Sequence, residues 1–203
     1  MQMDEYFTIK DCSEGIYKEK GSKFLSFAYP VYDTEKIKEI IAQKQKEFFD
    51  ARHCCYAWQL GLDSGNYRAN DDGEPSGTAG RPIHGQIQSH KLTNILIVVV
   101  RYFGGVKLGT SGLINAYKTA AADAIQNAEI VKKTVNDYYN IGFSYDAMND
   151  VMKLFKDENL KIIEQQFELH CNMKFSVRQS DAKRIVEKLE SITSVKVYYE
   201  YSA

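Results

Sequence analysis

No long apolar run occurs in this chain. The longest strongly apolar stretch is ILIVVV at residues 95–100, far shorter than the roughly 20 residues that a membrane-spanning helix needs. The N-terminal sequence MQMDEYFTIK also lacks the basic and then apolar character of a secretory signal. We therefore expect a cytoplasmic protein that does not associate with a membrane.

Cysteine patterns that are typical of metal sites and disulfide frameworks are absent as well. The four cysteines, Cys12, Cys54, Cys55 and Cys171, contain no CxxC pair. Neighbouring residues of a strand face opposite ways, so at most His53 and Cys55 could share a site. We expect buried free thiols, a packed or hydrogen-bonded His53, no metal site and no cofactor.

The chain also lacks an excess of positive charge. Its formal net charge is −1 and its pI is about 6.4. Residues 1–132 hold 16 Lys and Arg against 16 Asp and Glu, and residues 133–203 hold 10 against 11. Because phosphate neutralisation is the main non-specific attraction to nucleic acid, any such binding requires a local basic patch.

The periodicity of residues 1–132 predicts an α/β domain of two layers, with four or five strands and two helices. The run at 95–100 implies a strand that is covered on both faces. Residues 63–80 are rich in Gly, Ser, Asn and Asp, which predicts a long loop without secondary structure. The main expected elements are strands at 6–9, 24–31, 53–60 and 95–103, a helix at 35–49 capped by Asp33 or Thr34, and a helix at 111–128.

Residues 133–203 restart the pattern and predict a second domain. The expected order is a strand at 135–145, a helix at 147–157, strands on either side of about residue 168, a helix at 181–192 and a strand at 195–201. Asp146 and Ser180 are the expected helix caps. The order β-α-β-β-α-β is ferredoxin-like, so the fold class of the whole chain is predicted to be α+β.

A glycine-rich stretch, RYFGGVKLGTSGLINAY, occupies residues 101–117. A strand, a glycine turn and a helix N-terminus bring backbone N–H groups and the positive end of the helix dipole together, which suits a phosphate or carboxylate. It is no Walker motif, because Thr110 stands where lysine is required, and GxGxxG is absent. The glycines equally suit a tight turn that lets the helix pack closely, and the spacing leaves both interpretations open.

A polar stretch, DDGEPSGTAGRPI, occupies residues 71–83. Asp71, Asp72 and Glu74 could ligate Mg²⁺ or Ca²⁺ or act as general acid and base, although calcium-loop spacing is missing. Alternatively, the carboxylates accept backbone N–H bonds and shape the turn, and we prefer this structural or partner-binding role. No GxSxG elbow surrounds Ser76 or Thr78, so no catalytic residue is assigned.

These two stretches identify a family resemblance. Together with KGSKF at residues 20–24 and ARHCCYAW at 51–58, they resemble the motifs of the IMPACT/YigZ family. The resemblance covers both domains of its bacterial members. It implies that the first domain has the fold of the second domain of a small-subunit ribosomal protein, and that the second resembles the C-terminal domain of elongation factor G.

The resemblance also implies a link to translation. Eukaryotic members of the family regulate translation during amino-acid starvation by competing for a scaffold that activates a kinase, and the fold implies nucleic-acid binding. The family usually has glycine and arginine where this chain has Ser111 and Asn115. Loss of that arginine removes a phosphate ligand from the first turns of the helix.

We therefore expect a non-enzymatic, translation-linked regulator that binds RNA, the ribosome or a regulatory protein partner through both stretches. The predicted binding surface comprises Asp71, Asp72, Glu74, Ser76, Gly77, Thr78, Arg81, Arg101, Gly104, Gly105, Lys107, Gly109 and Gly112. Arg81, Arg101 and Lys107 would hold phosphates or carboxylates.

Two alternatives remain open from the sequence. One is a hydrolase or transferase that acts on a phosphorylated or carboxylated small molecule, with Asp71, Asp72 and Glu74 holding Mg²⁺ or acting as acid and base. The other is a pure protein-interaction module. Its expected surface is tyrosine-rich and lies in the second domain, at Tyr138, Tyr139, Tyr198, Tyr199 and Tyr201.

Overall fold

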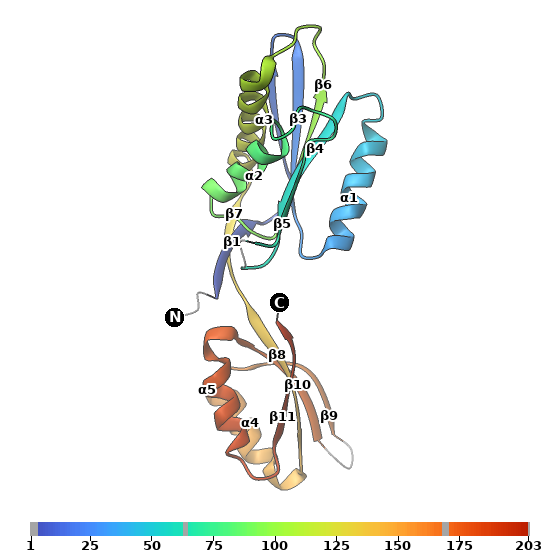
Figure 1. Cartoon of the computed structure of the whole chain (residues 1–203). Coiled ribbons are helices and arrows are strands. Elements are labelled where there is room, and N and C mark those ends of the chain that lie inside the picture. Colours follow the sequence, from blue (N-terminus) through green and yellow to red (C-terminus); the bar gives the residue numbers. More distant parts are fainter. Residues whose placement is uncertain (1–3, 63–64, 168–170, 203) are drawn as a thin grey trace. The chain divides into compact units, whose positions relative to one another are not determined.

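The computed structural model describes residues 4–62, 65–167 and 171–202 and shows a mixed α/β protein, in agreement with the predicted α+β class (Figure 1). Contacts within the chain define two compact units. One unit is Tyr6–Lys132. The other consists of the chain from Lys133 onward together with Asp4 and Glu5. Within the described ranges, no helix is long and apolar enough to span a membrane.

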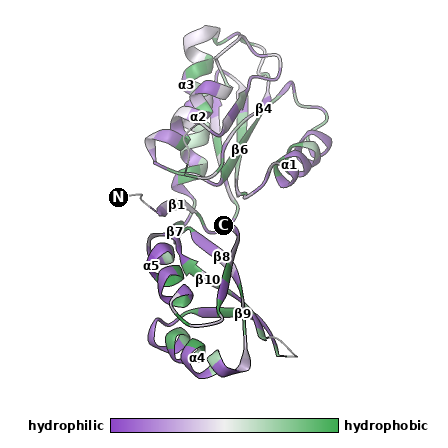
Figure 2. Cartoon of the chain, turned by 60° about the horizontal axis from the view of Figure 1, so that its bottom comes forward, coloured by the Kyte–Doolittle hydropathy of each residue, from purple (hydrophilic) through white to green (hydrophobic). Residues whose placement is uncertain are grey.

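The first unit is built on a five-stranded antiparallel sheet with the order β2-β3-β6-β4-β5. The central strand β6 is buried along its first seven residues, which explains the apolar run (Figure 2). The strands are β2 (Ser13–Glu19), β3 (Ser22–Pro30), β6 (Ile95–Tyr102), β4 (His53–Gln59) and β5 (Tyr67–Asn70).

Helices cover both faces of this sheet (Figure 1). Helix α1 (Thr34–Glu47) packs on one face, where Val98 belongs to the core, and α2 (Gly80–Ser89) and α3 (Gly109–Gln126) pack on the other, where Val99 belongs to the core. The predicted two-layer arrangement is therefore wrong. The apolar run at residues 95–100 implied a strand that is covered on both faces, and the structure confirms this.

Residues 63–80 contain more structure than predicted. Strand β5 lies within this stretch and α2 begins at its end, while residues 63 and 64 lie outside the described part of the chain. Strand β5 has no apolar alternation and is held by pairing with β4. At the start of helix α2, the Asp71 carboxylate accepts hydrogen bonds from the backbone N–H groups of Ala79 and Gly80. Both elements depend on partners that local periodicity does not reveal.

The second unit has the element order β-α-β-β-α-β, and its four-stranded antiparallel sheet has the order β11-β8-β10-β9. Helices α4 and α5 pack on one face (Figure 1). The elements are β8 (Asn136–Phe143), α4 (Met148–Asp157), β9 (Lys161–Phe167), β10 (Cys171–Arg178), α5 (Gln179–Glu190) and β11 (Lys196–Ser202). Strands β1 (Glu5–Ile9) and β7 (Ile130–Thr134) form a separate two-stranded sheet.

Helix caps were predicted with mixed success. Asp33 caps α1 as predicted, because its Oδ1 accepts a hydrogen bond from the Lys36 backbone N–H at 2.7 Å. Asp146 lies in a short 3-10 turn, and α4 has no side-chain cap. At α5, the Ser180 N–H donates to the Asp4 carboxylate at 3.0 Å. A cap that comes from a residue so distant in sequence cannot be found by a local pattern.

Candidate functional site

A pocket of about 650 Å³ lies where residues 71–83 and 101–117 meet. The register of the sheet explains part of its composition, because His53 on β4 pairs with Arg101 on β6 and Arg101 pairs with Phe24 on β3. We call it the glycine-turn pocket. Its lining residues are Arg52, His53, Glu74, Pro75, Arg101, Phe103, Lys107, Leu108, Gly109, Thr110 and Leu113.

A buried ion pair joins the two stretches. Arg101 Nη1 donates to Glu74 Oε1 at 2.6 Å, and the two side chains are only 7% and 3% exposed. The guanidinium carbon lies 5.5 Å and 5.6 Å from the ring centroids of Phe24 and Phe103, within the range of a cation–π contact. Within the described residues, Arg101 Nε is buried without a hydrogen-bond partner. Arg101 is therefore fixed in place while one of its donors stays unused.

Two further polar groups complete the support of Glu74. The Tyr117 hydroxyl donates to Glu74 Oε1 at 2.8 Å, and Cys55 Sγ donates to the Tyr117 hydroxyl oxygen at 3.4 Å. Burial is the main cause that raises the pKa of Tyr117 and the pKa of Cys55 far above their ordinary values. Both groups stay neutral, so Cys55 is a buried thiol with a structural role.

Asp71 organises the polar stretch. Its carboxylate accepts backbone N–H bonds from Gly77 at 2.8 Å, Ala79 at 3.0 Å and Gly80 at 2.8 Å. Burial raises the pKa of Asp71, but these bonds and the nearby Arg81 outweigh it, so that the pKa is lowered. The carboxylate thus remains charged and closes the loop onto the start of α2, which is the structural role preferred from the sequence.

Asp72 has a comparable role on the other side of the loop. Its carboxylate accepts the Cys54 backbone N–H at 2.6 Å, and its carbonyl oxygen accepts a bond from His53 Nδ1 at 2.7 Å. Asp71 and Asp72 do not line the pocket. Over residues 4–62, 65–167 and 171–202, no group of three or more His, Cys, Asp or Glu is placed to hold a metal ion. These donors do not fit the Mg²⁺ site of the enzyme alternative.

Other predicted surface residues shape the loop or lie outside the pocket. The Thr78 hydroxyl is buried and donates to the Pro75 carbonyl at 2.7 Å. Gly77 adopts a φ of +77°, and a Cβ there would lie 3.4 Å from Arg81 Cδ. Ser76 is exposed and, like Arg81, does not line the pocket. The predicted phosphate ligand Arg81 is therefore apart from Arg101 and Lys107.

The four glycines of residues 101–117 have different roles. A Cβ on Gly104 would lie 1.9 Å from the Gly21 carbonyl carbon, so Gly104 lets the β2–β3 turn approach closely. Gly105 and Gly109 have φ angles of +89° and +72°, which glycine adopts readily. Gly112 packs near Leu108, where an added Cβ would be tight at 3.0 Å. Of the four, only Gly109 lines the pocket.

The start of α3 supplies free hydrogen-bond donors to the pocket. Its N-cap, Leu108, makes no side-chain cap, and the first turn contains no acidic residue. The first N–H groups of a helix have no partner within the helix and carry partial positive charge. Gly109 and Thr110, which are at this end, line the pocket. The geometry thus favours the binding of an anion at this point.

Two cations stand in the pocket wall without an ion pair among the described residues. Arg52 and Lys107 are both exposed. Sequence reasoning missed Arg52 as a binding residue, although it lies within the family motif at residues 51–58. It is brought to the site because its N–H donates to the Arg101 carbonyl at 3.0 Å. Ser111 and Asn115, which depart from the family pattern, are exposed on α3 and do not line the pocket.

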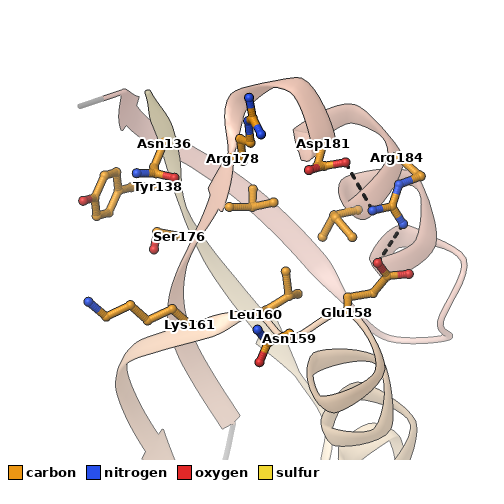
Figure 3. A pocket seen from close by; sticks show the side chains of 12 residues that line it. Asn136, Tyr138, Glu158, Asn159, Leu160, Lys161, Ser176, Arg178, Asp181 and Arg184 are labelled. Atoms are coloured by element: carbon orange, nitrogen blue, oxygen red, sulfur yellow. Dashed lines mark hydrogen bonds and ion pairs between the residues drawn. The ribbon is translucent and has the colours of Figure 1, made fainter. Parts of the chain in front are cut away.

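A second pocket, of about 360 Å³, lies in the second unit beside the start of α5 (Figure 3). We call it the α5 pocket. Its arginines already have partners: Arg184 Nη1 lies 2.7 Å from Glu158 Oε2, and Arg178 Nε lies 2.8 Å from Asp4 Oδ2. Lys161 also lines it and has no ion pair among the described residues. Most of its positive charge is therefore already neutralised.

Comparisons with known proteins agree with the motifs. Residues 20–125 match the family model described as the Impact N-terminal domain. The chain is 27% identical over 194 residues to IMPACT family member YvyE of Bacillus subtilis (strain 168), which covers 96% of this chain and 89% of YvyE. It is 31% identical over 172 residues to IMPACT family member YigZ of Escherichia coli (strain K12), which covers 84% of each.

A solved structure agrees over nearly the whole chain. It is described as the crystal structure of a hypothetical protein, with a TM-score of 0.74 and 27% identity, and the match covers 98% of this chain and 99% of that one. The predicted family resemblance is thus confirmed by the domain match, by relatives of similar length and by the fold. The chain belongs to the IMPACT family.

Proposed function

We propose that this chain is a cytoplasmic, translation-linked regulatory protein that binds RNA through the glycine-turn pocket. The translational link comes from the family, whose members include eukaryotic IMPACT homologues. RNA binding is supported by the convergence of three features on one pocket: Arg52 and Lys107, which have no ion pair within the described part of the chain, and the uncapped start of α3. In a chain of net charge −1, such a patch supplies the local attraction that phosphates need.

Each part of the pocket has a definite role in this proposal. Phosphate oxygens accept hydrogen bonds from the backbone N–H groups of Gly109 and Thr110. Arg52 and Lys107 provide opposite charge, and Phe103, which is 50% exposed, offers a ring face on which a base can stack. The charge of Arg101 is matched by Glu74, so Arg101 does not act as a free cation in the pocket.

Binding of labelled single-stranded RNA at several salt concentrations tests the proposal. The double variant Arg52→Ala/Lys107→Ala should weaken binding. It should also make the slope of log K against log salt concentration less negative by about 1.4, because each phosphate contact on a single strand contributes about 0.7 to that slope. The matched control is Lys38→Ala/Lys46→Ala, which removes two exposed cations from α1. Absence of RNA binding at low salt, or an equal loss in the control, would refute the proposal.

One observation favours an enzyme as the second candidate. The buried Glu74 carboxylate lies 3.9 Å from His53 Nε2, and both residues line the pocket beside the start of α3. A hydrolase or transferase that acts on a phosphorylated or carboxylated small molecule would use these two groups as acid and base. A thermal-shift screen with nucleotides and carboxylates tests it, because a ligand at 100 times its Kd stabilises by about 2.7 kcal/mol.

A further inference from the structure

We infer that the glycine-turn pocket holds the terminal phosphate monoester of a nucleotide, with the attached base against Phe103. This inference rests on the proposed RNA binding and specifies which part of the RNA enters the pocket. The volume of about 650 Å³ is in the range of pockets that enclose one small ligand. A pocket of this size takes a chain end rather than following a backbone over many nucleotides.

The charges of the pocket match a dianion. The Arg101–Glu74 pair is neutral as a unit, which leaves Arg52 and Lys107 as two unpaired positive charges among the described residues. The start of α3 adds about half a positive charge. A phosphate monoester carries about −1.5 to −2 at neutral pH, whereas a backbone phosphodiester carries a single negative charge. The monoester therefore fits the pocket better.

An unused donor provides independent support. Arg101 lines the pocket, its side chain is 7% exposed, and its Nε is buried without a partner in the described part of the chain. A buried donor without an acceptor is unfavourable. A phosphate oxygen at this wall would satisfy Arg101 Nε while Nη1 stays on Glu74.

Apolar groups at the same site suit the rest of a nucleotide. Phe103 is half-exposed, and Pro75, Leu108 and Leu113 also line the pocket. A base that stacks on an aromatic ring is held with little dependence on its identity. The pocket should therefore discriminate phosphorylated from unphosphorylated ends more strongly than it discriminates among bases.

The test compares one RNA oligonucleotide with a 5′-phosphate, a 3′-phosphate or hydroxyl groups at both ends, alongside free nucleoside monophosphates. At least one phosphorylated end should bind about tenfold more tightly than the hydroxyl end, as expected for one charge-assisted hydrogen bond. The 5′, 3′ and free-nucleotide arms identify the source of the monoester. Equal binding of phosphorylated and hydroxyl ends would overturn the inference but leave RNA binding intact.

The variant Thr110→Glu distinguishes a loss of phosphate binding from a loss of folding. A carboxylate in the first turn of a helix favours the helix, so this variant should fold, yet it should lose the preference for a phosphorylated end. Gln43→Glu, an equal change of charge at an exposed position of α1, should keep it. Retention of the preference in Thr110→Glu would contradict the inference.

The same data separate the inference from the proposed function. If no RNA binds but nucleoside monophosphates bind and lose affinity in Thr110→Glu, the monoester site stands while the RNA function fails. If neither RNA nor nucleotide binds, both are overturned.

Discussion

The glycine-turn pocket and the α5 pocket differ in what their charged groups already contact. Each lies beside the start of a helix and contains arginine. At the α5 pocket, the lining residues Arg178 and Arg184 pair with Asp4 and Glu158, and Asp4 also accepts from the Ser180 N–H at the start of α5. In the glycine-turn pocket, the start of α3 has no side-chain cap. The presence of arginines and a helix terminus does not by itself mark a binding site, because their donors can already be used within the protein.

The largest expected difference between the two pockets is how much their ion pairs contribute to the free energy of unfolding. Glu74→Ala should lower the free energy of unfolding by about 3–5 kcal/mol, because it leaves the Arg101 charge buried and unpaired. Glu158→Ala in the α5 pocket should cost less, because Arg184 is half-exposed and water replaces the lost partner. Urea unfolding of both variants measures the difference. Equal losses would show that burial does not distinguish the two ion pairs.

The two units also differ in how closely the backbone packs around a glycine. Gly104→Ala should cost about 1–3 kcal/mol, because a Cβ would overlap the Gly21 backbone and force a shift. Gly142→Ala, in the second unit, should be tolerated, since among the described residues its Cβ would meet only Asn172 Oδ1 at 3.4 Å. Thermal unfolding compares the two variants. Similar melting temperatures would argue against a tight backbone contact between Gly104 and the β2–β3 turn.

One carboxylate in each unit, Asp71 and Asp4, should make the stability of the fold depend on pH. The pKa of Asp71 is lowered by three backbone bonds and Arg81 despite burial, and the pKa of Asp4 is lowered chiefly by its hydrogen bond with Arg178. A lowered folded pKa gives stability that is fully present above the unfolded pKa of about 3.9 and is lost as pH falls through the folded pKa.

Asp71→Asn should therefore cost about 1–2 kcal/mol at neutral pH, as for loss of a helix cap, and the deficit should shrink at acidic pH. Asp4→Asn should show the same direction in the second unit. Urea unfolding between neutral pH and about pH 2 measures both. A deficit that does not change with pH would contradict the assigned role of the charged form.

The helix starts themselves give the smallest expected difference. Thr110→Glu should stabilise the fold by about 0.3–1 kcal/mol, because it adds negative charge at an uncapped helix start. Ser180→Glu occupies the matching position of α5, where Asp4 already accepts a bond and Asp181 is adjacent, so it should give no gain. Thermal unfolding at low salt is the appropriate measurement. A gain in both variants would remove the distinction between the two helix starts.

Much of the fold could be predicted because its signals are local. The apolar run of β6 and the Asp33 cap of α1 act through neighbours in sequence. Strand β5 could not be predicted in the same way, because it depends on pairing with β4. The cap of α5 comes from Asp4, at the other end of the chain.

The site was only partly predictable for the same reason. Both glycine-rich and polar stretches were identified, and the structure places Glu74, Arg101, Lys107 and Gly109 around one pocket. Arg101 was expected to hold phosphates or carboxylates as a free cation, but its charge is matched by Glu74. Arg52 was missed. Which cations are paired depends on side-chain geometry, which spacing along the chain does not specify.

In our proposal, RNA binds at the pocket whose cations have no ion pair among the described residues. The most direct test measures the affinity of single-stranded RNA for the unmodified chain and for two double variants. Arg52→Ala/Lys107→Ala removes two cations from the glycine-turn pocket, and Lys161→Ala/Arg184→Ala removes two from the α5 pocket. We predict a loss of about tenfold or more in the first double variant and little change in the second. Equal affinity in the two variants, or a greater loss in the second, would contradict RNA binding at the glycine-turn pocket.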